Sequence, residues 1–315
     1  MSLRIFVAGA TGVLGRGLIQ QFSARGHSVI GLSRDSGGEE VIRSLGGESR
    51  SGDIFDVDSL SRAADGADVV IHAATSIPTK TRTSARDWVM NDRLRREGTR
   101  ALTECAARIG AGLYLQQSIV WLARPKDGSY FDETSKPEPE PLILSALDSE
   151  TIALQAGTKF GFKVSVLRCG FFYGPDSSHT RMMGDMLMKR RFPIIGSGLA
   201  ELSCLQTNDA AGAFVAAAEG NKTGLWHVVD DQIVTVRDLL VEFALRLGAP
   251  APRSVPAWLA RLIAGRYAVN FLTSPVRTSN AKFRADFGWQ PRFPTYKEGL
   301  DQIVSIWKTR GFGNI

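Results

Sequence analysis

The most specific chemistry in this sequence is offered by a glycine-rich stretch near its start, Gly9-Ala10-Thr11-Gly12-Val13-Leu14-Gly15. The stretch lies between a short apolar run at 4–8 and a segment of helical periodicity at 13–25. Glycines in such a turn let the backbone approach a phosphate closely, and the next helix offers free N–H groups to the anion. Because the turn directly follows an expected strand, we predict that it binds the pyrophosphate of a dinucleotide. The expected contacts are Gly9, Thr11, Gly12, Val13, Leu14, Gly15 and Arg16.

The residues that end the second expected strand, at 28–32, indicate which dinucleotide is bound. A carboxylate at this point would accept hydrogen bonds from the ribose hydroxyls of NAD. The sequence instead has Ser33 and Arg34, and a hydroxyl with a guanidinium suits a 2′-phosphate. Arg16 can lend a second positive charge, while Asp35 comes one position late and is expected to face water. We therefore predict NADP(H) as the cofactor.

Two further segments are placed to complete this cofactor site. Asp53 and Ile54 follow a short third strand and are expected at the adenine edge. Ala73, Ala74 and Thr75 follow a run rich in β-branched residues and are expected to line the ribose. The carboxyl ends of parallel strands meet at one edge of a sheet, so these segments should converge.

The elements that must hold these residues alternate between strand and helix through the first half of the chain. This alternation predicts an α/β fold, a Rossmann-type doubly wound parallel sheet with a smaller C-terminal substrate lobe. We expect residues 1–175, with 203–229 returning to them, to form the dinucleotide-binding lobe, and 176–202 with 230–315 to form the substrate lobe. The stretch 125–141, with its prolines and acidic residues, is expected to be an exposed loop. Further strands are expected at 68–74, 113–118, 163–168 and 225–229, and helices at 88–109, 145–159, 236–247, 257–263 and 296–307.

Composition narrows the class of protein. The 315 residues are 43% apolar and carry a net charge of +6, and no run is long and apolar enough for a membrane span. The basic residues are scattered, so we expect no nucleic-acid partner. The three cysteines lie far apart without metal-ligand spacing, so we expect no metal site and a reducing, cytoplasmic location, with no targeting segment at the N-terminus.

Several motifs in combination resemble the extended short-chain dehydrogenase/reductase family, in its atypical, epimerase/dehydratase-like branch. The resemblance covers nearly the whole chain. The motifs are GATGVLG at 9–15, GDIFD at 52–56, DVVIHAA at 68–74, EGTRALTECAARIG at 97–110, LRCGFFYGP at 167–175 and GWQPRFPTYKEGL at 288–300.

The resemblance implies a catalytic Ser, Tyr and Lys, of which only the serine is present. Ser118 matches it at the end of a strand and would orient a carbonyl. The segment 141–150 is similar to the family's Pro-Tyr-x-x-Ser-Lys-x-x-Ala-Glu, and it places Leu142 at the tyrosine and Ala146 at the lysine. No Tyr-x-x-x-Lys spacing occurs elsewhere in the sequence, and Arg95 falls where the family often has Asn. The usual proton-transfer groups are therefore expected to be absent.

This absence leaves three functions open. The first is an NADPH-dependent ketoreductase whose substrate takes its proton from solvent or from its own hydroxyl, since positioning alone accelerates hydride transfer. Similarity to tailoring ketoreductases of antibiotic pathways, the angucyclinone type included, favours a bulky aromatic polyketide-like ketone. The second is a non-catalytic NADP(H)-binding sensor or partner-binding protein. The third, sugar-nucleotide epimerisation or dehydration, needs a positioned base that the sequence lacks. A monomer or a homodimer is expected.

Other candidate contacts come from the resemblance and from side-chain type. The loop of Cys169, Gly170 and Phe171 is expected to approach the nicotinamide, although Cys169 also suits simple packing. Each substrate candidate has an equally plain structural role: Tyr173 in packing, His179 in an exposed loop and the methionines in a helix core. The substrate candidates are Trp121, Leu142, Tyr173, His179, Met182 and Met183.

Overall fold

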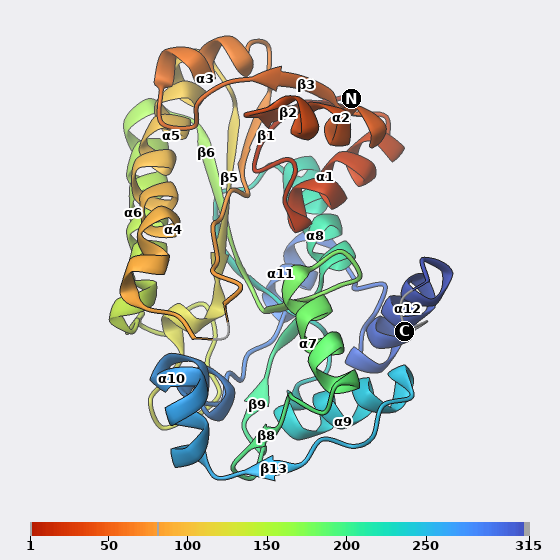
Figure 1. The fold of residues 1–315 in the computed structure, drawn as a ribbon. Helices are drawn as coiled ribbons and strands as arrows, with labels where there is room; N and C mark the ends of the chain where they lie inside the picture. Colours follow the sequence, from red (N-terminus) through yellow and green to blue (C-terminus); the bar gives the residue numbers. More distant parts are fainter. Residues whose placement is uncertain (1, 81, 312–315) are drawn as a thin grey trace.

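A computed structural model describes residues 2–80 and 82–311 of the chain. Within these residues the main sheet has seven parallel strands in the order β11-β6-β5-β4-β1-β2-β3 (Figure 1). This architecture confirms the predicted α/β class. The strands are β1 (Arg4–Ala8), β2 (Ser28–Ser33), β3 (Glu48–Ser51), β4 (Val69–His72), β5 (Leu113–Ile119), β6 (Lys163–Cys169) and β11 (Gly224–Val228).

The strand order reverses at β1, which pairs with β2 on one side and β4 on the other. Ile5 stands beside Val29 and Val69 in this register. Strands covered by helices on both faces are apolar throughout, and this is why β1 and β4 were readable in the sequence. A crevice forms outside the carboxyl ends where the order reverses, so the fold itself places the glycine turn at a ligand-binding position.

Helices cover both faces of the sheet (Figure 1). On one face α1 (Val13–Ala24), α8 (Thr207–Gly220) and α11 (Ala281–Phe287) bury Leu18, Phe214 and Phe283 in one apolar core. On the other, α3 (Val57–Ala63), α5 (Thr99–Arg108) and α6 (Leu144–Phe160) pack over Phe6 and Val70. The division into two lobes stays a prediction. Phe283 and Trp289 belong to the expected substrate lobe, but they pack in the apolar core between the sheet and helices α1 and α8.

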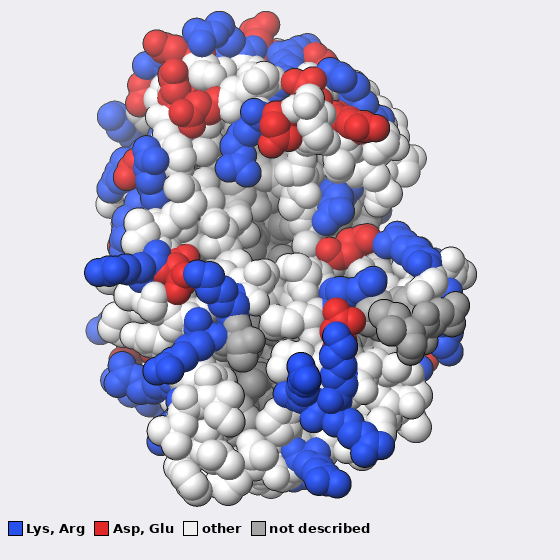
Figure 2. All heavy atoms as spheres, viewed as in Figure 1, with Lys and Arg blue, Asp and Glu red and all other residues white. Residues whose placement is uncertain are grey.

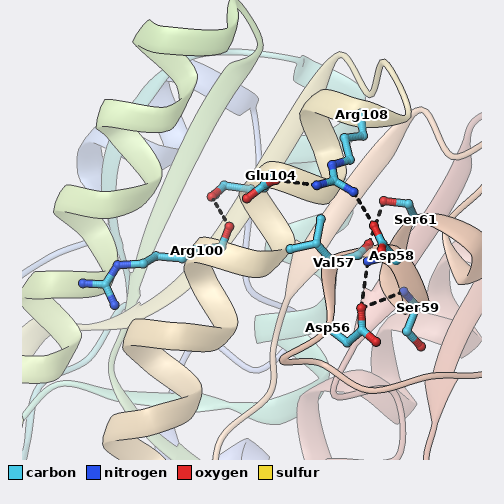
Figure 3. A network of polar contacts seen from close by, with 9 residues as sticks. Asp56, Val57, Asp58, Ser59, Ser61, Arg100, Glu104 and Arg108 are labelled. Atoms are coloured by element: carbon cyan, nitrogen blue, oxygen red, sulfur yellow. Dashed lines mark hydrogen bonds and ion pairs between the residues drawn. The ribbon is translucent and has the colours of Figure 1, made fainter.

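A polar network ties α3 to α5 at the surface (Figure 3). Arg108 donates to Asp58 at 2.5 Å and to Glu104 at 2.7 Å, and the Asp56 carboxylate caps α3 by accepting from the N–H groups of Asp58 and Ser59. Exposed ion pairs contribute about 0–1 kcal/mol, so the buried apolar contacts between these helices carry most of their attachment.

The helix expected over 88–109 is continuous in path but changes its winding. It runs through a 3₁₀ turn (Ala85–Trp88), α4 (Val89–Arg93), a π turn (Leu94–Gly98) and then α5. The Leu94 carbonyl accepts a hydrogen bond from Nε2 of His72 at 3.2 Å. Burial lowers the pKa of His72 to about 4, so the ring is neutral and Nε2 carries its proton. Such π turns occur often at functional sites.

The second half of the chain adds a smaller helical layer below the sheet (Figure 1). Its helix α10 passes the expected end at 263 because Gly265, at φ 83°, joins two helical stretches through a kink. The short strand pairs were not expected, since two or three residues carry no readable period. The helices are α7 (Ser178–Met188), α9 (Val236–Leu247), α10 (Ala257–Thr273) and α12 (Tyr296–Thr309), and the paired strands are β7 (Phe171–Tyr173) with β10 (Cys204–Gln206), β8 (Ile194–Ile195) with β13 (Ser254–Val255) and β9 (Glu201–Leu202) with β12 (Val234–Thr235).

The stretch 125–141 is irregular as expected, but it is only partly exposed. Phe131 is buried and meets the His227 ring edge-on at 5.6 Å, and Glu133 accepts a hydrogen bond from the His227 backbone N–H at 2.8 Å. The expectation of an exposed loop is therefore corrected for its centre, which these two contacts attach to β11. Smaller elements are α2 (Ser36–Ser44) and the 3₁₀ turns Val120–Ala123 and Pro141–Ile143.

Among the described residues, no helix has the length and apolar character to span a bilayer. The same residues contain no group of three or more His, Cys, Asp or Glu side chains arranged to hold a metal ion.

Candidate functional site

The glycine turn has a geometry that side chains would block. Gly9 has φ +91°, and a Cβ there would lie 2.5 Å from the backbone nitrogen of Ala74. A Cβ on Gly15 would overlap the carbonyl oxygen of Gly9. Gly12, the N-cap of α1, makes no side-chain capping hydrogen bond to the first N–H groups of this helix. The turn therefore forms an open cradle for an anion beside the loop that follows β4.

Positive charge stands next to this cradle. Arg16 is half-buried, and its Nε is buried without a hydrogen-bond partner among the described residues. Arg34 is exposed at the end of β2. A buried donor without a partner inside the protein is typical of a site that a ligand or water completes. The residues present thus fit the pyrophosphate of a dinucleotide.

Ser33 and Asp35 are held by their own turn. The Ser33 side chain is buried and donates its hydroxyl proton to the backbone carbonyl of Asp35 at 2.8 Å. Asp35 is exposed and caps α2 by accepting from the Gly38 N–H at 2.8 Å. In this arrangement Ser33 offers lone pairs but donates its proton within its own turn. Its expected contact with a 2′-phosphate, and those of Arg34 and Arg16, stay predictions.

The remaining cofactor candidates lie after the carboxyl ends of β3 and β4. Asp53 is exposed and accepts from the Phe55 N–H at 2.9 Å, while Ile54 is buried beside it. Ala73 is buried, Ala74 is half-buried and Thr75 is exposed. The fold brings these segments to the same sheet edge as the glycine turn, as parallel strands require.

Ser118, the expected catalytic serine, belongs to a buried charged cluster. Its hydroxyl donates to Oε1 of Glu150 at 2.5 Å, and Arg168 donates to both oxygens of that carboxylate at 2.8 and 2.7 Å. Each of the three side chains is about 2% exposed. Ser118 thus offers lone pairs but no proton in this arrangement. Sequence reasoning missed the cluster, although Glu150 is the last residue of the motif at 141–150 and Arg168 is the second residue of the one at 167–175.

Leu142 and Ala146, the positions that the resemblance assigns to Tyr and Lys, offer no ionisable group. Leu142 is half-buried in the 3₁₀ turn before α6, and Ala146 is 1% exposed within α6. Neither side chain can give or take a proton.

Two buried polar side chains project from the neighbouring helical segment. Asn91 is fully buried, and its Oδ1 accepts from the Ser76 N–H at 2.9 Å while its Nδ2 has no partner among the described residues. Arg95, in the π turn, is 7% exposed and its Nη1 is likewise unpartnered. Burial lowers the pKa of Arg95 to about 10, against the attraction of Asp92 and Glu150, so the guanidinium stays charged at neutral pH.

Three aromatic side chains from distant segments form one apolar wall. Trp121 stacks on Phe271 with ring centroids 5.2 Å apart and an interplanar angle of 18°, and Phe171 lies 5.8 Å from the same ring. The candidates Trp121 and Phe171 are thus brought together. Phe271, from the second half of α10, was missed because no sequence signal links it to the other two.

Three neighbouring candidates lie in the interior. Tyr173 is 1% exposed and donates its hydroxyl proton to Asp230 at 2.7 Å, which favours the packing role that the sequence left open beside a substrate contact. Cys169 is equally buried, and burial raises the pKa of its thiol. Gly170 leaves no room for a side chain, because a Cβ would lie 2.5 Å from the Ser203 carbonyl oxygen.

The candidates on α7 divide between surface and core. His179 is half-buried with Nε2 3.3 Å from the Pro78 carbonyl oxygen. Met182 lines a shallow hollow of about 480 Å³. Met183 packs in the core between α7 and α9, which favours the helix-core role that the sequence left open beside a substrate contact. Figure 2 shows Lys and Arg gathered on the lower half of this face. The other residues of the hollow are Thr79, Ser178, Arg181, Asp185, Met186, Lys189 and Arg191.

Comparison with known proteins agrees with this geometry. Residues 5–228 match the family described as the NAD dependent epimerase/dehydratase family. The chain is 34% identical over 311 residues to the 3-diazoavenalumate denitrifying reductase of a Streptomyces species. The aligned region covers 95% of this chain and 99% of that relative. It is 26% identical over 327 residues to the 4-hydroxy-2-methyl-3-oxo-4-farnesyl-3,4-dihydroquinoline-1-oxide ketoreductase of Stigmatella aurantiaca, covering 96% of each chain.

Solved structures share the fold at low identity. UDP-glucose 4-epimerase of Thermotoga maritima has a TM-score of 0.81 at 19% identity and covers 98% of this chain and 99% of its own. The dTDP-glucose 4,6-dehydratase DesIV of Streptomyces venezuelae has a TM-score of 0.79 at 21% identity and covers 98% of both chains. With the match over residues 5–228 and the full-length relative, these findings establish that the chain belongs to the NAD dependent epimerase/dehydratase family.

Proposed function

We propose that this protein is an NADPH-dependent reductase that delivers a hydride to a bulky, planar aromatic ketone of the polyketide type. The observation that carries the proposal is a glycine turn that fits a dinucleotide, beside an Arg16 whose buried Nε has no hydrogen-bond partner among the described residues. The same chain has Leu142 and Ala146 at the positions where the family pattern places its proton-transfer groups. The bound cofactor would supply the hydride. The reductase and ketoreductase names of two full-length relatives support the same class of reaction.

The residues of this chain would bind and orient rather than exchange protons. The glycine turn, Arg16 and Arg34 would hold the cofactor phosphates. The wall of Trp121, Phe171 and Phe271 would give a planar ketone an aromatic surface to pack against. Holding donor and acceptor carbons about 3–3.5 Å apart supplies much of the rate in such a transfer. The alkoxide would take its proton from water or from a neighbouring phenol or enol of the substrate.

A second class of hydride acceptor, an aryl diazonium ion, also fits the site because its reduction needs no proton. An aryl diazonium ion that gains a hydride forms a C–H bond, breaks its C–N bond and releases N₂, so the reaction balances without an acid. The name of the Streptomyces relative describes a denitrifying reductase of a diazo compound. The basic hollow beside Met182 also suits a carboxylate on such a substrate. Epimerisation or dehydration of a sugar nucleotide is less favoured, because neither Leu142 nor Ala146 can act as a base.

The test is NADPH consumption at 340 nm against three kinds of acceptor: simple aliphatic ketones, hydroxylated aromatic ketones and an aryl diazonium acid. Turnover confined to the hydroxylated ketones supports the proposal, and turnover of the diazonium acid alone supports the second acceptor. Turnover of simple ketones would mean that an unidentified side chain supplies the proton. NADPH bound tightly without turnover of any acceptor would favour a non-catalytic sensor. The variant Gly15→Val, which should not bind the cofactor, is the background control.

A further inference from the structure

The buried guanidinium of Arg95 has no role in the site described so far. The side chain is 7% exposed, yet its Nη1 has no hydrogen-bond partner in the described part of the chain. A buried donor left unpaired costs folding free energy, and a charged donor costs more than a neutral one. Groups of this kind are rare and call for a specific explanation, such as a ligand that completes them.

The contacts on either side of Arg95 fix where it lies. Ser145 donates to Asp92 at 2.6 Å, and Arg96 donates to Asp148 at 2.6 Å. The face of the helical segment around Arg95 therefore rests on the first turns of α6. The two contacts bracket Ala146, whose side chain is a buried methyl group.

Two departures from the family pattern thus lie on two helical segments that these contacts hold together. The resemblance assigns a lysine to Ala146 and often an asparagine to Arg95. One segment carries a long cationic side chain and the other a buried methyl group, whereas the pattern expected from the family has the long cation on α6 and the shorter side chain at position 95. Volume and positive charge are both conserved by this exchange, although the charge comes from a different helix.

Asp92 and Glu150 attract the Arg95 guanidinium, but no described residue accepts a hydrogen bond from its Nη1. Glu150 stands one helical turn beyond Ala146, and its carboxylate already accepts from Ser118 and Arg168. Asn91, one turn before Arg95, holds the Ser76 N–H at 2.9 Å. This contact joins the Arg95 segment to the loop after β4, which is expected to line the ribose.

We propose that Arg95 hydrogen-bonds the hydroxyls of the nicotinamide-side ribose and takes the place that Ala146 leaves open. The planar guanidinium offers two N–H groups in a fixed fork, which matches a pair of vicinal hydroxyl oxygens. The inference rests on the proposed function only in assuming NADP(H) at the glycine turn. Arg95 acts here through binding, and no proton transfer is assigned to it.

The test compares two ligands by isothermal titration calorimetry. NADPH contains the nicotinamide ribose, whereas adenosine 2′,5′-bisphosphate retains the adenine and the 2′-phosphate but lacks it. Arg95→Met should raise the Kd for NADPH about 10-fold or more, as expected for the loss of hydrogen bonds from a charged donor, and leave the Kd for the bisphosphate within about two-fold. Arg96→Met, a half-exposed arginine on the same segment, is the matched control and should change neither Kd.

A double variant keeps the inference testable if Arg95→Met does not fold. Arg95→Asn with Ala146→Lys restores the family arrangement and should bind NADPH within about three-fold of the parent. An unchanged NADPH affinity in Arg95→Met, an equal loss for both ligands, or weak NADPH binding by a folded double variant would overturn the inference. A parent chain that does not bind NADPH would instead overturn the proposed function.

Discussion

The buried pair of Glu150 and Arg168 allows a quantitative test of the site's architecture. Both side chains are about 2% exposed and are joined by two hydrogen bonds, at 2.8 and 2.7 Å. Glu150→Leu would leave Arg168 as an uncompensated buried cation, and Arg168→Met would leave Glu150 with only Ser118 and the more distant Arg95. Removing one partner of a buried pair costs about 3–5 kcal/mol of the free energy of unfolding.

The double variant should be far less destabilised than the sum of the two single variants. With both charges gone, the main loss at this point is the acceptor of the Ser118 hydroxyl, which costs about 1–3 kcal/mol. The two single variants together should cost about 6–10 kcal/mol, so the coupling energy of the cycle should be about 3 kcal/mol or more.

Guanidinium denaturation followed by circular dichroism and by tryptophan fluorescence measures each free energy of unfolding, provided that the two transitions coincide. The control is the same cycle on Arg96 and Asp148, whose side chains are 37% and 38% exposed and 2.6 Å apart. That pair should show a coupling of about 1 kcal/mol or less. A coupling for Glu150 and Arg168 no larger than in the control would refute the description of a buried, mutually dependent pair.

Three further predictions concern cofactor choice, the substrate side and pH. Arg34→Asp should raise the Kd for NADPH about 10- to 100-fold, as the loss of a charge-assisted contact predicts, and leave NADH unaffected; an equal loss for both cofactors would contradict a contact with the 2′-phosphate. Leu142→Phe should lower kcat/KM for the substrate with NADPH affinity unchanged, and weaker NADPH binding would show that Leu142 does not stand at the substrate side. Burial raises the pKa of Asp230 to about 7, with Asp209 and Asp231 adding to the effect against hydrogen bonds from Tyr173 and Gln206. Between about pH 4 and 7 the folded chain therefore holds a proton that the unfolded chain has released, so this contribution to stability is lost progressively across that range and is constant above about 7. Relative to Asp230→Asn, the wild type should lose stability between pH 4 and 7 by at most about 1.4 kcal/mol per pH unit in urea denaturation, and a constant difference would contradict the raised pKa.

The sheet was predictable because its strands are buried on both faces and read as short apolar runs. Val69 to His72 and Leu113 to Ile119 are strands of this kind. The short paired strands of the lower layer follow from contacts between distant segments, as between Leu202 and Val234, and leave no local pattern. A glycine with positive φ usually ends a helix, so the sequence predicts an end near Gly265. The continuation of α10 to Thr273 depends on the packing of its second half, which leaves no local signal.

The glycine turn was predictable for a different reason: its chemistry is local. Gly9, Gly12 and Gly15 make the cradle within seven residues, and the strand before them fixes its position. The Ser118 cluster unites residues 32 and 18 positions apart, so its members can be recognised singly but their hydrogen bonds cannot. The same holds for Phe271, whose partners Trp121 and Phe171 lie on distant segments.

The absence of a tyrosine and a lysine need not abolish hydride transfer, because acid catalysis supplies the smaller part of the barrier. A positioned general acid contributes a factor of about 10²–10⁴, or about 3–5 kcal/mol, to a typical reaction. Holding the reactants in place can contribute about 7–11 kcal/mol, and the proposed function assigns this purpose to the groups of the site. A ketone with its own hydroxyl beside the carbonyl would recover the rate factor that a general acid otherwise supplies, and a ketone without this hydroxyl would not. Matched aromatic ketones that differ only in that hydroxyl should therefore differ in kcat by about 10²–10⁴ if the substrate provides the proton. Equal rates for the two ketones would place an unrecognised acid in the protein and would refute the assignment of a purely binding role to this site.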